Sequence, residues 1–62
     1  MNSNSNLVGK SVKMVKPTAT TTKNKKYKVL GVNYAGSPYC EIRITNDNGR
    51  PIIILRKRVR AL

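Results

Sequence analysis

The sequence predicts an all-β fold, a small five-stranded barrel similar in size to other minimal β domains, and three observations support this fold class. No segment of about ten residues or more repeats its apolar side chains with a helical period. Short runs rich in β-branched and aromatic residues alternate instead with clusters of Gly, Pro and Asn, which favour turns. A flat sheet of a 62-residue chain would leave an apolar face in water, so we expect the strands to curl into a barrel.

The chain length fits one small domain preceded by a tail. Residues 1–7 are rich in Asn and Ser and carry little to bury, so we expect a disordered polar tail. The remaining residues, 8–62, are expected to form the barrel domain. A domain of this size has a thin core and no room for a deep cleft.

The first strand is predicted at residues 10–16, where Val12 and Met14 share one face. Pro17 has no N–H to donate to a ladder, so the strand is expected to end there. The following stretch, 18–26, is rich in Thr and Lys and lacks a large apolar residue. We expect it to form an exposed, cationic loop.

The second and third strands are predicted at residues 27–32 and 39–45, with a Gly- and Pro-containing turn at 33–38 between them. Gly31 within the second strand indicates a bulge or a close backbone approach. The third strand alternates most clearly, and the side chains that share its inner face are Cys40, Ile42 and Ile44.

The C-terminal part is predicted to contain a hairpin, a strand and a final short element. Residues 46–49, Asn-Asp-Asn-Gly, are typical of a tight hairpin turn. The fourth strand is expected at 51–55. Residues 56–62 are expected to form a short helical turn and a last strand, with Val59 and Leu62 touching the core.

The composition argues against an enzyme. The chain carries 13 Lys or Arg, two acids and no His, for a net charge of +11. General acid–base catalysis uses His or paired carboxylates, and a zinc site needs about four suitable ligands. We therefore expect no catalytic residues, no metal and no cofactor.

The sequence also predicts a cytoplasmic protein with no membrane partner. Cys40 is the single cysteine, so no internal disulfide can form. The N-terminal residues lack the basic and apolar regions of a signal peptide. The longest apolar run, residues 52–55, is far shorter than the roughly 18 residues of a transmembrane helix.

The positive charge lies in two blocks. Residues 1–28 contain seven Lys and no acid, and residues 50–62 contain five basic residues and no acid. Both acids lie between the blocks, in residues 29–49. If the first strand lies near the C-terminal segment, the two blocks form one cationic face that attracts phosphates. Alternatively, the charges serve solubility, or protect an edge strand from aggregation.

We expect this face to bind nucleic acid, DNA or RNA. Arg makes bidentate contacts that Lys does not make, so Arg56, Arg58 and Arg60 are the candidates for tight contacts. Tyr34, flanked by turn residues, is the tyrosine expected to be exposed and able to stack on a base. The candidate lysines, suited mainly to steering, are Lys10, Lys13, Lys23, Lys25, Lys26, Lys28 and Lys57.

The remaining polar and aromatic residues are expected to have structural roles. Tyr27 and Tyr39 are predicted to be half-buried strand residues, and Cys40 a small buried hydrophobe. Asp47 is expected to stabilise its turn. Glu41 is expected to pair with Arg43 or with a cation on a neighbouring strand.

Three stretches, residues 9–14, 26–32 and 41–52, resemble small Src-homology-3-like β-barrels of the kind found in short phage-encoded and nucleic-acid-binding proteins. The resemblance covers residues 8–62 and implies a long first loop, a later hairpin and a short helical turn before the last strand. It does not extend to proline-rich peptide binding, because the chain has no Trp and its long loop is basic.

These observations leave three functions open. The first is a non-catalytic module that contacts the phosphate backbone of nucleic acid. The alternative is a protein-interaction module, such as a phage modulator, that docks on an acidic surface of a host enzyme. The third is a structural subunit of a larger particle. A monomer or a small homo-oligomer is compatible with each of them.

Overall fold

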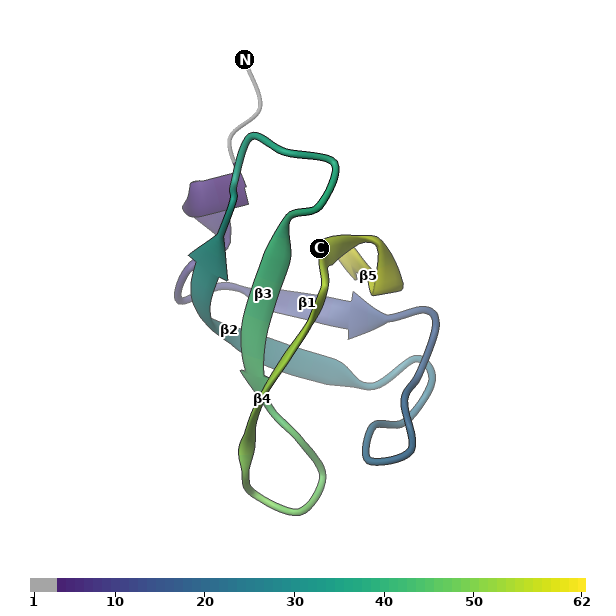
Figure 1. The fold of residues 1–62 in the computed structure, drawn as a ribbon. Coiled ribbons are helices and arrows are strands. Elements are labelled where there is room, and N and C mark those ends of the chain that lie inside the picture. Colours follow the sequence, from purple (N-terminus) through teal and green to yellow (C-terminus); the bar gives the residue numbers. More distant parts are fainter. Residues whose placement is uncertain (1–3) are drawn as a thin grey trace.

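The structure is a computed structural model that describes residues 4–62, and it confirms an all-β chain (Figure 1). Apart from two short 3-10 turns, every regular element of the described residues is a strand. In chain order the elements are η1 (Asn4–Leu7), β1 (Ser11–Met14), β2 (Lys26–Asn33), β3 (Glu41–Thr45), β4 (Pro51–Leu55), η2 (Arg56–Arg58) and β5 (Val59–Ala61).

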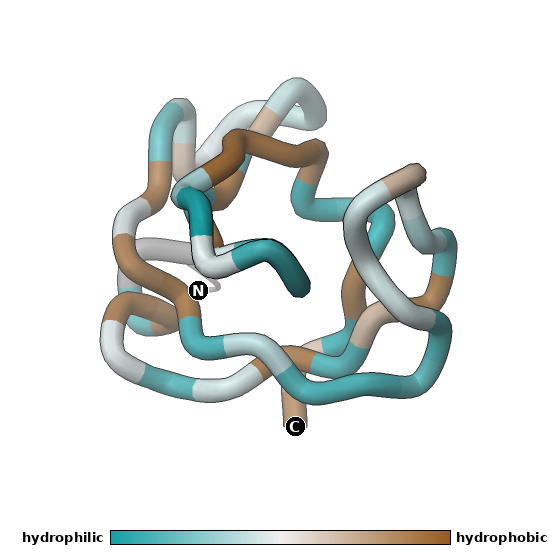
Figure 2. Tube along the Cα trace, turned by 90° about the horizontal axis from the view of Figure 1, so that it is seen from below, coloured by the Kyte–Doolittle hydropathy of each residue, from teal (hydrophilic) through white to brown (hydrophobic). Residues whose placement is uncertain are grey.

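The strands form one antiparallel sheet in the order β4-β3-β2-β1-β5. The long strand β2 connects the two halves of the sheet, β1 with β5 and β3 with β4. Its first part pairs with β1, and its second part pairs with β3. Within the pairing of β2 with β3 the register shifts between Val29 and Gly31, which confirms the irregularity predicted at Gly31. Such a bulge bends the strand, so the sheet curls around a common interior (Figure 2).

The prediction of a closed barrel is wrong. The strands at the two edges, β4 and β5, do not pair with each other within the described residues. They are joined by η2, which turns the chain away from β4, and β5 then continues along β1 through the pairs Val12↔Ala61 and Met14↔Val59. The sheet is therefore curled but open, with two free edges.

The core lies inside the curl. Its fully buried side chains come from β1, β2 and β3 and are Val12, Met14, Val29, Ile42 and Ile44. Leu7, Tyr27, Ile54 and Val59 complete the buried cluster. The alternation predicted for the third strand is confirmed, because Cys40, Ile42 and Ile44 are all buried.

The two ends of the chain differ from expectation. Of the tail predicted at 1–7, residues 1–3 lie outside the described residues. Asn4–Leu7 form a 3-10 turn whose last side chain, Leu7, is buried in the core cluster. Leu62 was expected to touch the core on a helical turn but is 67% exposed. Val59 lies on a strand instead, and residues three positions apart on a strand point to opposite faces.

Candidate functional site

A row of three cations crosses the sheet on its outer face. In the strand registers, Lys13 of β1 stands opposite Lys26 of β2 on one side and opposite Arg60 of β5 on the other. Directly opposed residues share a face, with Cβ atoms about 4.5–5.5 Å apart. Because Val12 and Met14 point into the core, Lys13 and its two partners point outward. We call Lys26, Lys13 and Arg60 the cationic row.

An open groove of about 660 Å³ lies beside this row. Four of its lining residues are cations that come from both charge blocks of the sequence. These cations are Lys13, Arg56, Lys57 and Arg60. Val15, 41% exposed, and Ala61 add apolar surface to the same groove. The pairing of β1 with β5 thus brings the two blocks together here, and we call this feature the cationic groove.

Arg56 is held in place by the backbone. Its Nη1 donates a 2.8 Å hydrogen bond to the carbonyl oxygen of Val59, and its Nε is buried without a hydrogen-bond partner among the described atoms. A guanidinium fixed in this way presents its remaining N–H groups in one orientation. An anion in the groove would meet a donor that is already oriented.

Arg58 has a structural role. Its backbone carbonyl accepts hydrogen bonds from the N–H groups of Val15 and Lys16, at 2.8 and 2.9 Å. Its Nη1 donates to the carbonyl of Lys16 at 3.2 Å. These bonds join η2 to the end of β1, so Arg58 shapes the wall of the groove rather than lining it.

Lys25 is paired elsewhere. Its Nζ lies 2.7 Å from Asp47 Oδ1, and this is the ion pair found within residues 4–62. The ammonium also lies 5.5 Å from the centre of the Tyr27 ring, within cation–π range. Of the predicted lysines, Lys25 is therefore the one whose charge is already compensated.

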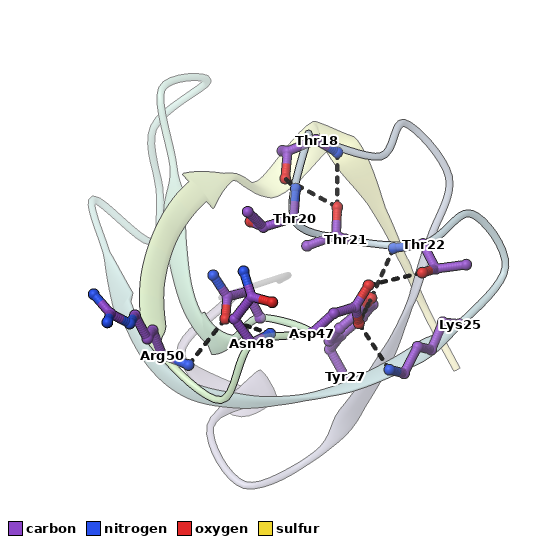
Figure 3. Close-up of polar contacts among 10 residues, drawn as sticks. Thr18, Thr20, Thr21, Thr22, Lys25, Tyr27, Asp47, Asn48 and Arg50 are labelled. Carbon is purple, nitrogen blue, oxygen red and sulfur yellow. Dashed lines mark hydrogen bonds and ion pairs between the residues drawn. The ribbon is translucent and has the colours of Figure 1, made fainter.

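The Asp47 carboxylate accepts hydrogen bonds from three side chains outside its hairpin, in the Thr-rich loop and at the start of β2, as Figure 3 shows. It accepts from Thr22 Oγ1, Lys25 Nζ and Tyr27 OH, each at 2.7 Å. The hydrogen bond from Lys25, followed by those from Tyr27 and Thr22, lowers the pKa of Asp47 to about 2. In turn, the hydrogen bond to Asp47 raises the pKa of Lys25. Nothing local to the turn indicates these partners, because they lie 20 to 25 positions away in the sequence.

The Thr-rich loop is ordered by this contact. The N–H of Asp47 donates to the carbonyl of Thr20 at 2.9 Å, and Thr21 is buried and accepts from the N–H of Thr18 at 2.7 Å. Asn24, with a φ of 68°, donates its N–H to the carbonyl of Met14 at 2.7 Å. The loop predicted at 18–26 is therefore fixed to the hairpin and to β1, although its lysines are exposed.

The other predicted site residues lie outside the groove. Lys28 stands opposite Ser11 on the outer face, whereas Lys10 and Lys23 are exposed in the segments around β1 and the Thr-rich loop. Tyr34 is 69% exposed, as predicted. The prediction that Tyr39 is a half-buried strand residue is wrong, because it precedes β3 and is 76% exposed. Both tyrosines lie between β2 and β3, and neither lines the groove.

Tyr27, Cys40 and Glu41 are the residues to which the sequence assigned structural roles. Tyr27 and Cys40 are buried, which agrees with a structural role for each. Glu41 has no ion pair within the described residues, so the pairing predicted for it is not found. Residues 4–62 also contain no cluster of three or more His, Cys, Asp or Glu that could hold a metal. No helix in this part of the chain is long and apolar enough to span a membrane.

Comparison with protein-family models, with curated proteins and with solved structures finds no match to this chain. The fold and the site are therefore interpreted from their own geometry.

Proposed function

We propose that the protein is a non-catalytic nucleic-acid-binding module that holds a phosphate backbone with the cationic row and the cationic groove. The observation that carries the proposal is the position of Lys13, which stands between Lys26 and Arg60 on an exposed face. Like charges directly opposite each other across strands are destabilising. A phosphate backbone laid across the row would convert this repulsion into attraction.

The distribution of the two acids supports the same function. Asp47 is engaged by Lys25, Tyr27 and Thr22, and its ion pair is with Lys25 rather than with a member of the row. Glu41 stands opposite Leu55 on the other half of the sheet. A face with one sign of charge focuses potential and raises the rate of association with a polyanion.

The connections between the strands support a distant relationship to Src-homology-3-like domains as part of this proposal. A long loop follows β1, a tight hairpin joins β3 to β4, and a 3-10 turn precedes β5. The curled sheet would then be an open member of that group, in which β1, β5 and the first part of β2 present the binding face.

The test is to measure binding to duplex DNA, single-stranded DNA and RNA by fluorescence anisotropy over a series of salt concentrations. If the row and the groove together neutralise about five phosphates, the log–log slope with salt on duplex DNA is about −4 to −5. Undetectable binding to all three at about 50 mM salt would refute the proposal.

Polyglutamate of matched charge is the control polymer in this series. Weaker binding to polyglutamate than to nucleic acid supports phosphate recognition. Equal or tighter binding favours the alternative, a module that docks on an acidic protein surface, since the same positive face would serve that function.

A further inference from the structure

The strand β4 forms one unpaired edge of the sheet. The alternation of hydrogen bonds between β3 and β4 shows which backbone N–H and C=O groups of β4 face outward. The N–H of Asn46 donates to the carbonyl of Arg50 at 2.8 Å, and the N–H of Arg56 donates to the carbonyl of Cys40 at 2.9 Å. In an antiparallel ladder, hydrogen-bonded pairs alternate with pairs that are not bonded. Ile52 and Ile54 therefore bond to β3, and the N–H and C=O groups of Ile53 and Leu55 face away from the sheet.

This edge is less protected against pairing than the other edge of the sheet. Natural proteins protect edge strands by short length, charged side chains, Pro or bulges, and β4 has only the Pro at its first position. The other edge, β5, has three residues and carries Arg60 at its centre. By contrast, Pro51–Leu55 contains five residues and no charge, and Ile53 is 56% exposed. The register across β4 and β3 is also regular along its whole length.

The residues around the β4 edge set the charge of what can pair with it. Arg43 stands opposite Ile53 on the outer face of the sheet, but its guanidinium lies over Gly31 of β2, away from β4. Arg50 is exposed and immediately precedes the strand. Arg56 follows the strand, and Glu41, opposite Leu55, is the acid of this region. The surroundings are cationic, most clearly at the Arg50 end.

A second copy of the chain does not fit this edge well. In an antiparallel pair of β4 strands centred on Ile53, Arg50 of each copy would face Arg56 of the other. Like charges directly opposite are unfavourable, and each copy carries a net charge of +11.

We propose that the β4 edge binds an extended acidic peptide segment of a partner protein, which adds a strand to the sheet. The peptide backbone bonds to the outward groups of Ile53 and Leu55, an apolar side chain packs on Ile53, and an acidic residue lies toward Arg50. Such strand addition takes its affinity from main-chain hydrogen bonds and its specificity from alternate side chains. Arg56 lines the cationic groove and also follows β4, but Ile53 and Leu55, whose backbone groups the peptide bonds, do not line the groove, so the inference does not depend on the proposed function.

The probe is a fluorescent nine-residue peptide with two glutamates at each end and alternating valine and threonine between them. Two N-methylated versions block alternate sets of amides. We expect methylation of the set that faces β4 to weaken binding to the unchanged protein by about tenfold, because two hydrogen bonds are lost. Methylation of the other set leaves binding nearly unchanged. Equal effects of the two sets, or no binding of the parent peptide, would overturn the proposal.

Two variants at one position test the same point from the protein side. Ile53→Pro removes an outward N–H that β3 does not use, and edge strands tolerate Pro in this position. Ile53→Thr keeps the N–H and serves as the matched control. We expect Ile53→Pro to bind the peptide about tenfold more weakly than Ile53→Thr, with both variants folded by circular dichroism.

Equal binding by the two folded variants would contradict strand addition, and the methylated peptides decide the question if Ile53→Pro does not fold. Polyglutamate that binds as tightly as the peptide would show attraction by charge alone. A dimer of the free protein in analytical ultracentrifugation that Ile53→Pro abolishes would instead assign this edge to a second copy. Each of these results counts against the proposed acidic peptide.

Discussion

The hydroxyl group of Tyr27 and the carboxylate of Asp47 lie 2.7 Å apart, and this hydrogen bond joins the start of β2 to the hairpin between β3 and β4. The same hydroxyl accepts a hydrogen bond from the N–H of Thr22 at 2.8 Å. One side chain thus fixes the Thr-rich loop and the hairpin to each other. Because Asn24 of this loop lines the cationic groove, the contact also shapes one wall of the candidate site.

The stability of the protein is expected to fall in acid through Asp47. The pKa of this carboxyl is about 2 in the folded protein, below its ordinary value of 3.8, so the unfolded chain binds the proton more tightly. The stabilisation is present above about pH 4 and is lost as the pH falls from 4 toward 2. Thermal unfolding between pH 6 and pH 2 measures this decline.

Asp47→Asn is the variant that tests this assignment. It should have a lower unfolding midpoint at pH 6 and a flatter decline toward pH 2, because the titrating group is absent. Glu41→Gln removes the other acid, which has no ion pair in residues 4–62, and serves as the matched control. Parallel curves for the unchanged protein and Asp47→Asn would contradict the assignment.

Tyr27→Phe should destabilise the protein by about 1–2 kcal/mol, because it removes a hydroxyl that accepts from Thr22 and donates to Asp47 while leaving the ring in the core. Urea unfolding measures the loss. Combined with Asp47→Ala, which unlike Asp47→Asn leaves no side-chain oxygen to accept from Tyr27, the double variant should lose less than the sum of the two single variants, since both remove the same hydrogen bond. Strict additivity would show that the contact contributes nothing.

Arg60→Gln should change stability and binding in opposite directions. Removing one of two opposed cations is expected to stabilise the sheet by about 0.5 kcal/mol. It should also weaken binding to duplex DNA and reduce the magnitude of the salt slope by about 0.9 if Arg60 contacts one phosphate. Chemical unfolding and anisotropy measure the two effects.

The control for that variant is Lys23→Gln, which removes an exposed positive charge outside the row and the groove. A simple dependence on net charge predicts the same loss of binding for both variants. A specific contribution of the cationic row predicts a larger loss for Arg60→Gln. Equal losses would therefore contradict the row as the site of contact.

Leu7→Ala should destabilise the protein by about 2 kcal/mol, because it opens a cavity beside the core cluster. Val8→Ala, at a side chain that is 52% exposed, should change stability by less than about 0.5 kcal/mol. Equal effects would indicate that the fold does not depend on η1. The comparison uses denaturant unfolding of the two variants.

The strands could be predicted because their information is local. Alternation placed Cys40, Ile42 and Ile44 on the inner face, and Asn-Asp-Asn-Gly at 46–49 located the hairpin. There, Asn46 Oδ1 accepts from the N–H groups of Asn48 and Arg50 at 3.0 and 2.9 Å. Gly49 has a φ of 78°, which Gly adopts without strain.

The pairing of edges and the long-range contacts could not be predicted in the same way. Alternation identifies a strand but not the strand that pairs with it. The sequence therefore did not show that β4 and β5 remain unpaired with each other, and the sheet is open where a barrel was expected. The Asp47 contacts join residues twenty or more positions apart, and nothing local to the turn indicated them. Leu7 was assigned to the tail because its neighbours are polar, although a single apolar side chain was enough to reach the core.

The candidate site was partly predictable. The two charge blocks are visible in the sequence, but their meeting depends on the register of β1 with β5, which sets Lys13 against Arg60. The sequence could not distinguish Lys25, which pairs with Asp47, from its neighbour Lys26, which belongs to the cationic row. Neighbouring side chains such as Lys25 and Lys26 point in different directions, and only the tertiary structure shows that Lys25 is the one that reaches Asp47.

The pairing of β1 with β5 has a consequence for the order in which the protein is made. The pair Val12↔Ala61 joins residues separated by most of the described chain, so β1 is synthesised well before its neighbour β5. Until residues 59–61 leave the ribosome, one side of β1 remains unpaired and the cationic groove does not exist. Closing so long a loop is entropically costly and slows folding. The proposed binding surface therefore depends on a long-range contact and forms only after β5 has been synthesised.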